Sequence, residues 1–130
     1  MKVIYCKILV LLVIFDGISF SQSRDEQISK GIDYVYKMQH DSANMIFQQF
    51  VNQDPKDPTG YFLQSMNEWW KIYQVKEDYS NDDKYLARAD LCIKACEEKL
   101  DANENDDWAT FMLGGVIGYR GFMNAMRNNW

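Results

Sequence analysis

The chain has 130 residues with a formal charge of −5, and 47% of its residues are hydrophobic. This length favours one domain, and the hydrophobic content is too high for a largely disordered chain. The acidic balance argues against nucleic acid as a partner, because its phosphates need a basic surface, and against binding to an anionic membrane surface.

Residues 1–21 have the composition of a secretory signal peptide. A basic start is followed by an unbroken apolar run, ILVLLVIF, over residues 8–15. Ser19 and Ser21 then place small residues at the −3 and −1 positions of a cleavage before Gln22. The run is well short of the roughly 20 residues of a bilayer span, so we expect cleavage, and membrane attachment only if the segment is retained. The remainder, of net charge −6, is expected to be exported, either periplasmic or secreted.

Residues 24–57 show the pattern of two amphipathic helices joined by a tight turn. Ser23 or Asp25 can cap the first helix, Asp41 the second, and Asp54-Pro55 ends the pair. Apolar side chains share one face of the first helix: Ile28, Ile32 and Val35. They do so again in the second helix: Ala43, Ile46, Phe47, Phe50 and Val51. Two such helices with a short connection are expected to pack antiparallel.

At this point a family resemblance emerges. Five residues have the spacing of the conserved positions of the tetratricopeptide repeat: Gly31, Tyr34, Ala43, Phe47 and Pro55. The pair therefore resembles that family, although Phe50 stands where the family usually has Ala and Gln27 where it has Trp. The resemblance implies an all-α, right-handed superhelix of antiparallel helix pairs whose first helices line a concave groove. Such modules usually bind peptides or protein partners.

A second unit is predicted over about residues 58–104, with Asp57 as cap and Pro58 in the first turn. Its first helix is the most aromatic segment of the chain, and a polar stretch over 74–84 then predicts a loop or an extended helix end. The apolar positions of its second helix follow a helical spacing: Leu86, Ala89, Ile93, Cys96 and Leu100.

An incomplete third unit is predicted over residues 105–130. Gly121 resembles the glycine of the turn between the two helices of a repeat. Three further glycines inside its first helix predict close approach of a neighbouring helix: Gly114, Gly115 and Gly118. The last residues have the pattern of an uncapped apolar face, which either binds something, including a second copy, or is covered by a continuation of the chain: Phe122, Met123, Met126 and Trp130.

Chemical motifs are weak. His40, the only histidine, is expected to be a polar surface residue in a turn, because no nucleophile or acid can be assembled around it. Cys92 and Cys96 lie on one helix face and are expected to be small core residues, since a tight zinc site needs more ligands. Residues 101–107 mimic a calcium loop but lack its glycine and its final Glu. We therefore expect no catalytic site, metal or cofactor.

The preferred hypothesis is a non-enzymatic scaffold that binds a protein or peptide. Aromatic residues are the candidates for its groove: Trp69, Trp70, Tyr73, Phe62, Tyr61 and Trp108. Neighbours on a helix point about 100° apart, so we expect only one of the two adjacent tryptophans to lie fully in the core, and the other either faces the partner or also packs against neighbouring helices. Two alternatives remain. The chain is the N-terminal part of a larger exported protein whose activity lies elsewhere, or it is a structural module that self-associates through Phe122, Met126 and Trp130.

Overall fold

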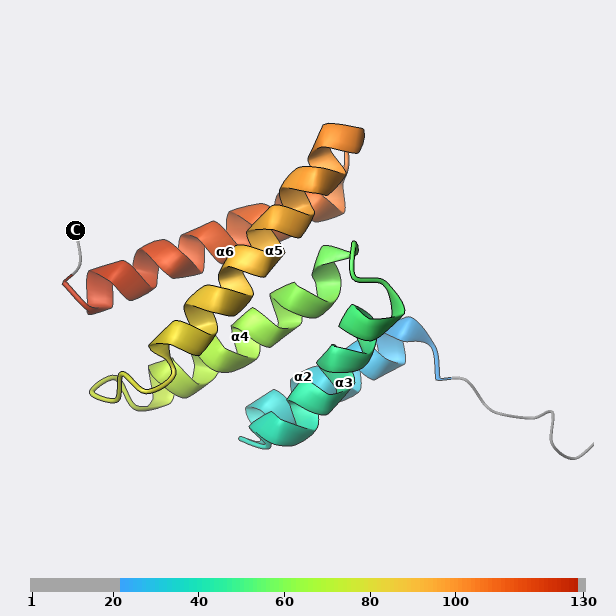
Figure 1. Cartoon of the computed structure of the whole chain (residues 1–130). Helices are drawn as coiled ribbons and strands as arrows, with labels where there is room; N and C mark the ends of the chain where they lie inside the picture. The colour runs from blue at the N-terminus through green and yellow to red at the C-terminus, as the bar shows by residue number, and fades with distance from the viewer. Residues whose placement is uncertain (1–21, 129–130) are drawn as a thin grey trace, which may run out of the picture.

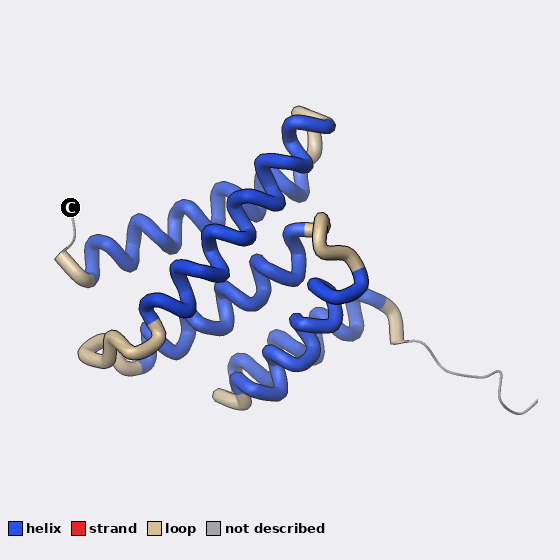
Figure 2. Tube along the Cα trace, in the orientation of Figure 1, coloured by secondary structure: helices blue, strands red, loops and turns tan. Residues whose placement is uncertain are grey.

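The computed structural model describes residues 22–128, and this part of the chain is all-α, as predicted. It contains five helices (Figure 1): α2 Arg24–Tyr36, α3 His40–Gln53, α4 Pro58–Gln74, α5 Asp82–Ala102 and α6 Asp107–Met126. Short loops join them, and no strand occurs between residues 22 and 128 (Figure 2). The predicted signal peptide and Trp130 lie outside the described residues.

The helices alternate in direction along the chain. α2, α4 and α6 run in one direction, and the intervening helices of the chain, α3 and α5, run in the opposite direction (Figure 1). Each helix packs on its neighbours in the chain, and α4 also packs on α6. None of the helices in the described part is long and apolar enough to cross a membrane.

The first helix pair is held by close packing and by caps that the sequence predicted. A Cβ added at Gly31 would stand 2.3 Å from Cε1 of Phe47, so glycine is required where α2 meets α3. Ser23 caps α2, where it forms a capping box with Glu26, and the Asp57 side chain accepts from the backbone N–H of Thr59 to cap α4.

The turn between α2 and α3 differs from the prediction. It is closed by Met38 in the left-handed region at φ 59°, and α3 begins at His40, so Asp41 lies inside its first turn instead of capping it. His40 is not a simple surface residue. Its Nδ1 lies 2.8 Å from Oδ1 of the buried Asn67, whose amide donates to the His40 carbonyl. These two bonds tie the start of α3 to α4.

The larger core lies between α4, α5 and α6. Its buried side chains come from all three helices: Trp69, Ile72, Tyr85, Ala89, Cys92, Cys96, Met112, Val116 and Met123. The two thiols are free and fully buried, with their sulfurs 4.0 Å apart, which matches the prediction of core residues. Residues 75–81 form the predicted loop before α5.

α6 is one continuous helix through Gly121, so the turn predicted there is wrong. The reason is that Val116 and Met123, two turns apart, are both buried against α4 and α5. Burying this seam outweighs the roughly 1 kcal/mol that a glycine costs inside a helix. The prediction of an uncapped face at Met123 and Met126 is also wrong, because Met123 belongs to the core and Met126 packs against it.

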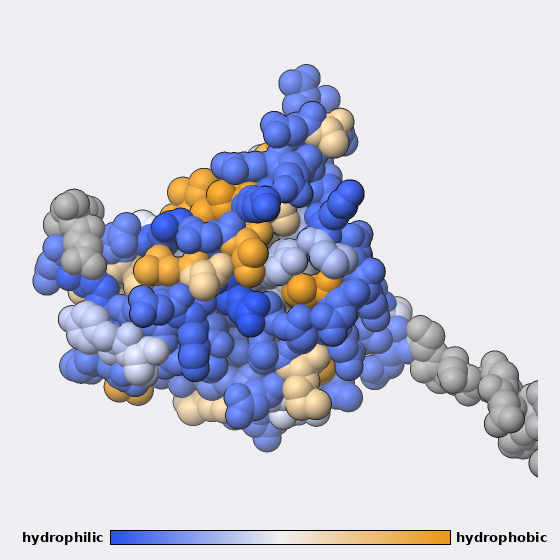
Figure 3. All heavy atoms as spheres, in the orientation of Figure 1, coloured by the Kyte–Doolittle hydropathy of each residue, from blue (hydrophilic) through white to orange (hydrophobic). Residues whose placement is uncertain are grey.

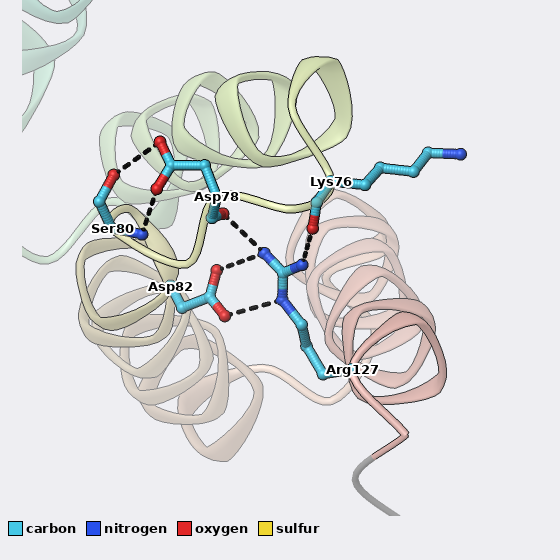
Figure 4. Close-up of polar contacts among 5 residues, drawn as sticks. All are labelled: Lys76, Asp78, Ser80, Asp82 and Arg127. Carbon is cyan, nitrogen blue, oxygen red and sulfur yellow. Dashed lines mark hydrogen bonds and ion pairs between the residues drawn. The ribbon is translucent and has the colours of Figure 1, made fainter.

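The C-terminal end of α6 is anchored by Arg127, a residue that the sequence did not single out. Its guanidinium donates two hydrogen bonds to Asp82, of 2.8 and 2.9 Å, and others to the carbonyls of Lys76 and Asp78 (Figure 4). It also lies 4.0 Å above the ring of Tyr79. The bond to Asp82 holds the pKa of Arg127 above its usual value, so the arginine stays charged. The α4–α5 loop and α6 are thereby fixed to each other.

Candidate functional site

Two hollows lie on the inner face, which we define as the face formed by α2, α4 and α6. The aromatic hollow, of about 550 Å³, lies between α4 and α6 and is lined by Trp69, Trp70, Tyr73, Gly114, Gly115, Gly118, Tyr119 and Phe122. The N-terminal hollow, of about 650 Å³, lies where the three helices begin and is lined by Arg24, Asp25, Ile28, Ser29, Ile32, Asp57, Thr59, Phe62, Leu63, Trp108 and Phe111. Neither hollow is lined by α3 or α5.

Trp69 supports the rings of the aromatic hollow. Its side chain is only 4% exposed, and its ring centroid lies 5.3 Å from that of Tyr119, 5.5 Å from that of Phe122 and 6.3 Å from that of Tyr73. Trp70 is half-buried and stands edge-on to Tyr73 at 5.8 Å. As predicted, only one of the adjacent tryptophans is fully in the core, because neighbours on a helix point about 100° apart.

Three of the five residues that line the aromatic hollow from α6 are glycines. Apart from the adjoining turns of α6 itself, a Cβ added at Gly114 or Gly118 would have no atom of the described residues within 4 Å, so the close helix approach predicted at these positions is wrong. Gly115 differs, because its Cβ would stand 3.1 Å from the ring of Phe62. The bare backbone leaves room in front of the rings that α4 presents.

Exposed rings and one ion pair shape the N-terminal hollow. Trp108 stacks on Phe111 with centroids 5.4 Å apart, and its Nε1 donates to Oγ1 of Thr59 at 3.2 Å. Arg24 donates to the Asp57 carboxylate at 2.6 Å. Burial pushes the pKa of Asp57 up, but hydrogen bonds from Thr59 and Arg24 outweigh it and hold the pKa below its usual value. The Asp57 carboxylate of this hollow therefore stays ionised at neutral pH.

The ring of Phe62 separates the two hollows. It belongs to the N-terminal hollow, lies 6.2 Å from the Phe111 ring across the inner face, and is the side chain that a Cβ at Gly115 would meet. α4 and α6 are thus bridged by aromatic contact about one turn from the start of each helix, where the N-terminal hollow adjoins the aromatic hollow.

Charge is distributed unevenly between the two ends of the domain. Ten carboxylates and five cationic side chains lie at the end where α2, α4 and α6 begin: Asp25, Glu26, Asp54, Asp57, Glu97, Glu98, Asp101, Glu104, Asp106 and Asp107, against Arg24, Lys30, Lys56, Lys94 and Lys99. The opposite end of the domain, within residues 22–128, carries eight carboxylates and seven cationic side chains. The N-terminal hollow therefore opens at the acidic end, whereas no charged side chain lines the aromatic hollow.

Five of the six predicted groove residues line a hollow. Trp69, Trp70 and Tyr73 line the aromatic hollow, and Phe62 and Trp108 line the N-terminal hollow. The sixth, Tyr61, lines neither and packs on the larger core.

The sequence reasoning missed the α6 contribution. Tyr119 was not singled out, and Phe122, 52% exposed, was assigned to a terminal face although it lines the aromatic hollow. A signal was present in their spacing, because Gly115, Gly118 and Phe122 recur on one helical face.

In the view of Figure 3 most of the surface is hydrophilic, and the largest apolar patch follows α6.

Among residues 22–128, no three His, Cys, Asp or Glu side chains gather as a metal-binding group. The thiol hydrogen bond with Cys96 and burial raise the pKa of Cys92, so this cysteine remains a thiol.

Comparison of the chain with protein-family models, curated proteins and solved structures gives no match. Its function is therefore inferred from the geometry of the inner face.

Proposed function

We propose that this chain is a non-enzymatic scaffold of the cell envelope that binds a peptide or protein partner on its inner face. In this proposal the helices form a right-handed array of tetratricopeptide-like pairs, with α2, α4 and α6 as the first helices of successive units. The N-terminal segment is a secretory signal, which would deliver the domain outside the cytoplasm.

One observation carries the proposal: both hollows are lined only by α2, α4 and α6, and both are rich in aromatic side chains. Aromatic residues in concave apolar sites are the usual anchors of a bound partner, because they bury a large area with little loss of conformational freedom. Four of the exposed large hydrophobic side chains line these hollows from α6 alone: Trp108, Phe111, Tyr119 and Phe122. Contiguous exposed apolar surface of this kind marks interaction sites.

The glycines of α6 provide a direct test. Gly118 lines the aromatic hollow and Gly121 does not, yet a Cβ at either position would meet no atom of the described chain within 4 Å. Gly118→Leu therefore fills the hollow, and Gly121→Leu is a matched control with the same gain in helix propensity.

The measurement begins with selection of peptides from a randomised displayed library against the purified chain. We expect selected peptides to bind Gly118→Leu at least tenfold more weakly than the unchanged chain, and to bind Gly121→Leu within twofold of it. Circular dichroism of both variants checks that they fold alike. No enrichment, or peptides that bind the two variants equally, would contradict the proposed function.

A further inference from the structure

We infer that the inner face takes an extended peptide with two bulky apolar side chains four residues apart, a small residue midway between them, and basic residues beyond the anchor that enters the N-terminal hollow. This inference rests on the proposed function and specifies the partner of the same site. Three features of the inner face support it, namely the separation of the hollows, the ring between them and the charge at one end.

The separation of the hollows sets the spacing of the anchors. Along α4, the N-terminal hollow is lined up to Leu63 and the aromatic hollow begins at Trp69 and reaches Tyr73. The midpoints of the two linings are about ten residues apart on α4 and about eight to nine apart on α6, so at 1.5 Å per residue of helix the centres of the two hollows are about 13–15 Å apart. An extended chain advances roughly 3.3 Å per residue, so four residues span about 13 Å.

Strand geometry then directs both anchors to the same side. Successive side chains of an extended peptide point to opposite faces, so the first and fifth residues of a segment both face the protein. The third residue faces it too, and it lies over Phe62, the ring that bridges to Phe111 between the hollows. A bulky side chain there would collide with this ring, which is why the middle position must be small.

The same ring disfavours a bound helix. A helix with side chains is about 10–12 Å across, and each hollow has a volume of only about 550 or 650 Å³. A cylinder of that width would rest on Phe62 and could not enter both hollows at once. A single extended chain crosses the ring and still sends one side chain into each hollow.

Charge complementarity sets the direction of the motif. The N-terminal hollow opens at the acidic end of the domain. Its own lining holds two carboxylates, Asp25 and Asp57, against the single cation Arg24, and Asp25 is exposed. Basic residues of the partner are attracted to this end, whereas the aromatic hollow has no charged lining and favours an uncharged anchor. The partner is therefore apolar at one end of the motif and cationic beyond the other.

The test uses fluorescein-labelled synthetic peptides and the purified full chain, with binding followed by fluorescence polarisation. The reference peptide is Lys-Lys-Trp-Ser-Gly-Ser-Phe, with its termini blocked. Matched peptides place Trp and Phe two, six or eight residues apart with Ser and Gly between them. Two further peptides replace the central Gly by Phe, or Lys-Lys by Glu-Glu.

We expect the spacing of four to bind at least tenfold more tightly than any other spacing, and the central Phe to weaken binding at least fivefold. Glu-Glu should weaken binding about fivefold in low salt, with a smaller difference at 0.5 M salt because of screening. Tightest binding at eight residues would overturn the extended conformation in favour of a helix. Equal binding at all spacings would overturn the two-anchor motif, and equal binding of the Glu-Glu peptide would overturn the charge assignment.

These outcomes are distinguishable from failure of the proposed function. Suppose that the peptides bind the unchanged chain, bind the Gly118→Leu variant more weakly, and show no preference for spacing. In that case the inner face is a binding site and the proposed motif is wrong. If none of the peptides binds and the library selection also yields none, both inferences fail together.

Discussion

Gly31 in α2 and Gly60 in α4 are closely packed, whereas three of the four glycines of α6 are open. A Cβ at Gly31 would stand 2.3 Å from the Phe47 ring, and a Cβ at Gly60 would stand 2.8 Å from the backbone nitrogen of Val51. At Gly114, Gly118 and Gly121 no atom of the described chain lies within 4 Å. The same residue type therefore permits close helix packing in one region and leaves a helix surface bare in the other.

This difference has an energetic consequence. In the first pair, the contact between α2 and α3 compensates for the cost of glycine in a helix. In α6 there is no such compensation, so each open glycine leaves the helix about 0.5–1 kcal/mol less stable than alanine would. That unrecovered cost fits a surface kept clear for a partner, and it makes the anchoring of α6 by Arg127 important.

The largest expected effect comes from breaking that anchor. Arg127→Ala should lower the free energy of unfolding by about 3 kcal/mol, because it leaves Asp82 partly buried without its cation and frees two backbone carbonyls. Denaturation by urea would measure the loss. Arg120→Ala is the matched control, since its ion pair with Asp90 is exposed and should contribute less than about 1 kcal/mol. Equal losses in the two variants would show that the buried pair does not anchor α6.

A smaller effect is expected where the first pair is packed. Gly31→Ala should cost about 2 kcal/mol, because its methyl group overlaps the ring of Phe47, which is only 1% exposed and has no room to move. Comparing the thermal unfolding of Gly31→Ala with that of Gly121→Ala would separate the effect of packing on stability from the effect of helix propensity. An unchanged melting temperature for Gly31→Ala would show that α2 does not approach α3 this closely.

The smallest effect has the opposite sign and sharpens the contrast. Gly114→Ala and Gly121→Ala should each stabilise the protein by about 0.5–1 kcal/mol, since alanine favours the helix and its methyl group enters open space. The same urea denaturation would detect this gain. A loss of stability in either variant would mean that these positions are covered in solution, as a second copy of the chain on α6 would produce.

Several features of the fold could be predicted from local sequence alone. The caps at Ser23 and Asp57 and the burial of Phe47 were predicted because each depends on residues within a few turns of one another. The placement of Phe62, Trp69 and Tyr73 along one helix was predictable for a similar reason, since rings at helical spacing indicate one helix.

The sequence by itself determined the all-α class, where the first pair begins and closes, and that the domain is acidic. Only the tertiary structure decided that α6 continues through Gly121, that Tyr119 and Phe122 complete the aromatic hollow, and that Arg127 fixes the end of α6. The physical reason is range. Helix formation and capping depend on neighbours in the chain, whereas the face that a glycine-rich helix presents depends on packing against helices up to some fifty residues away.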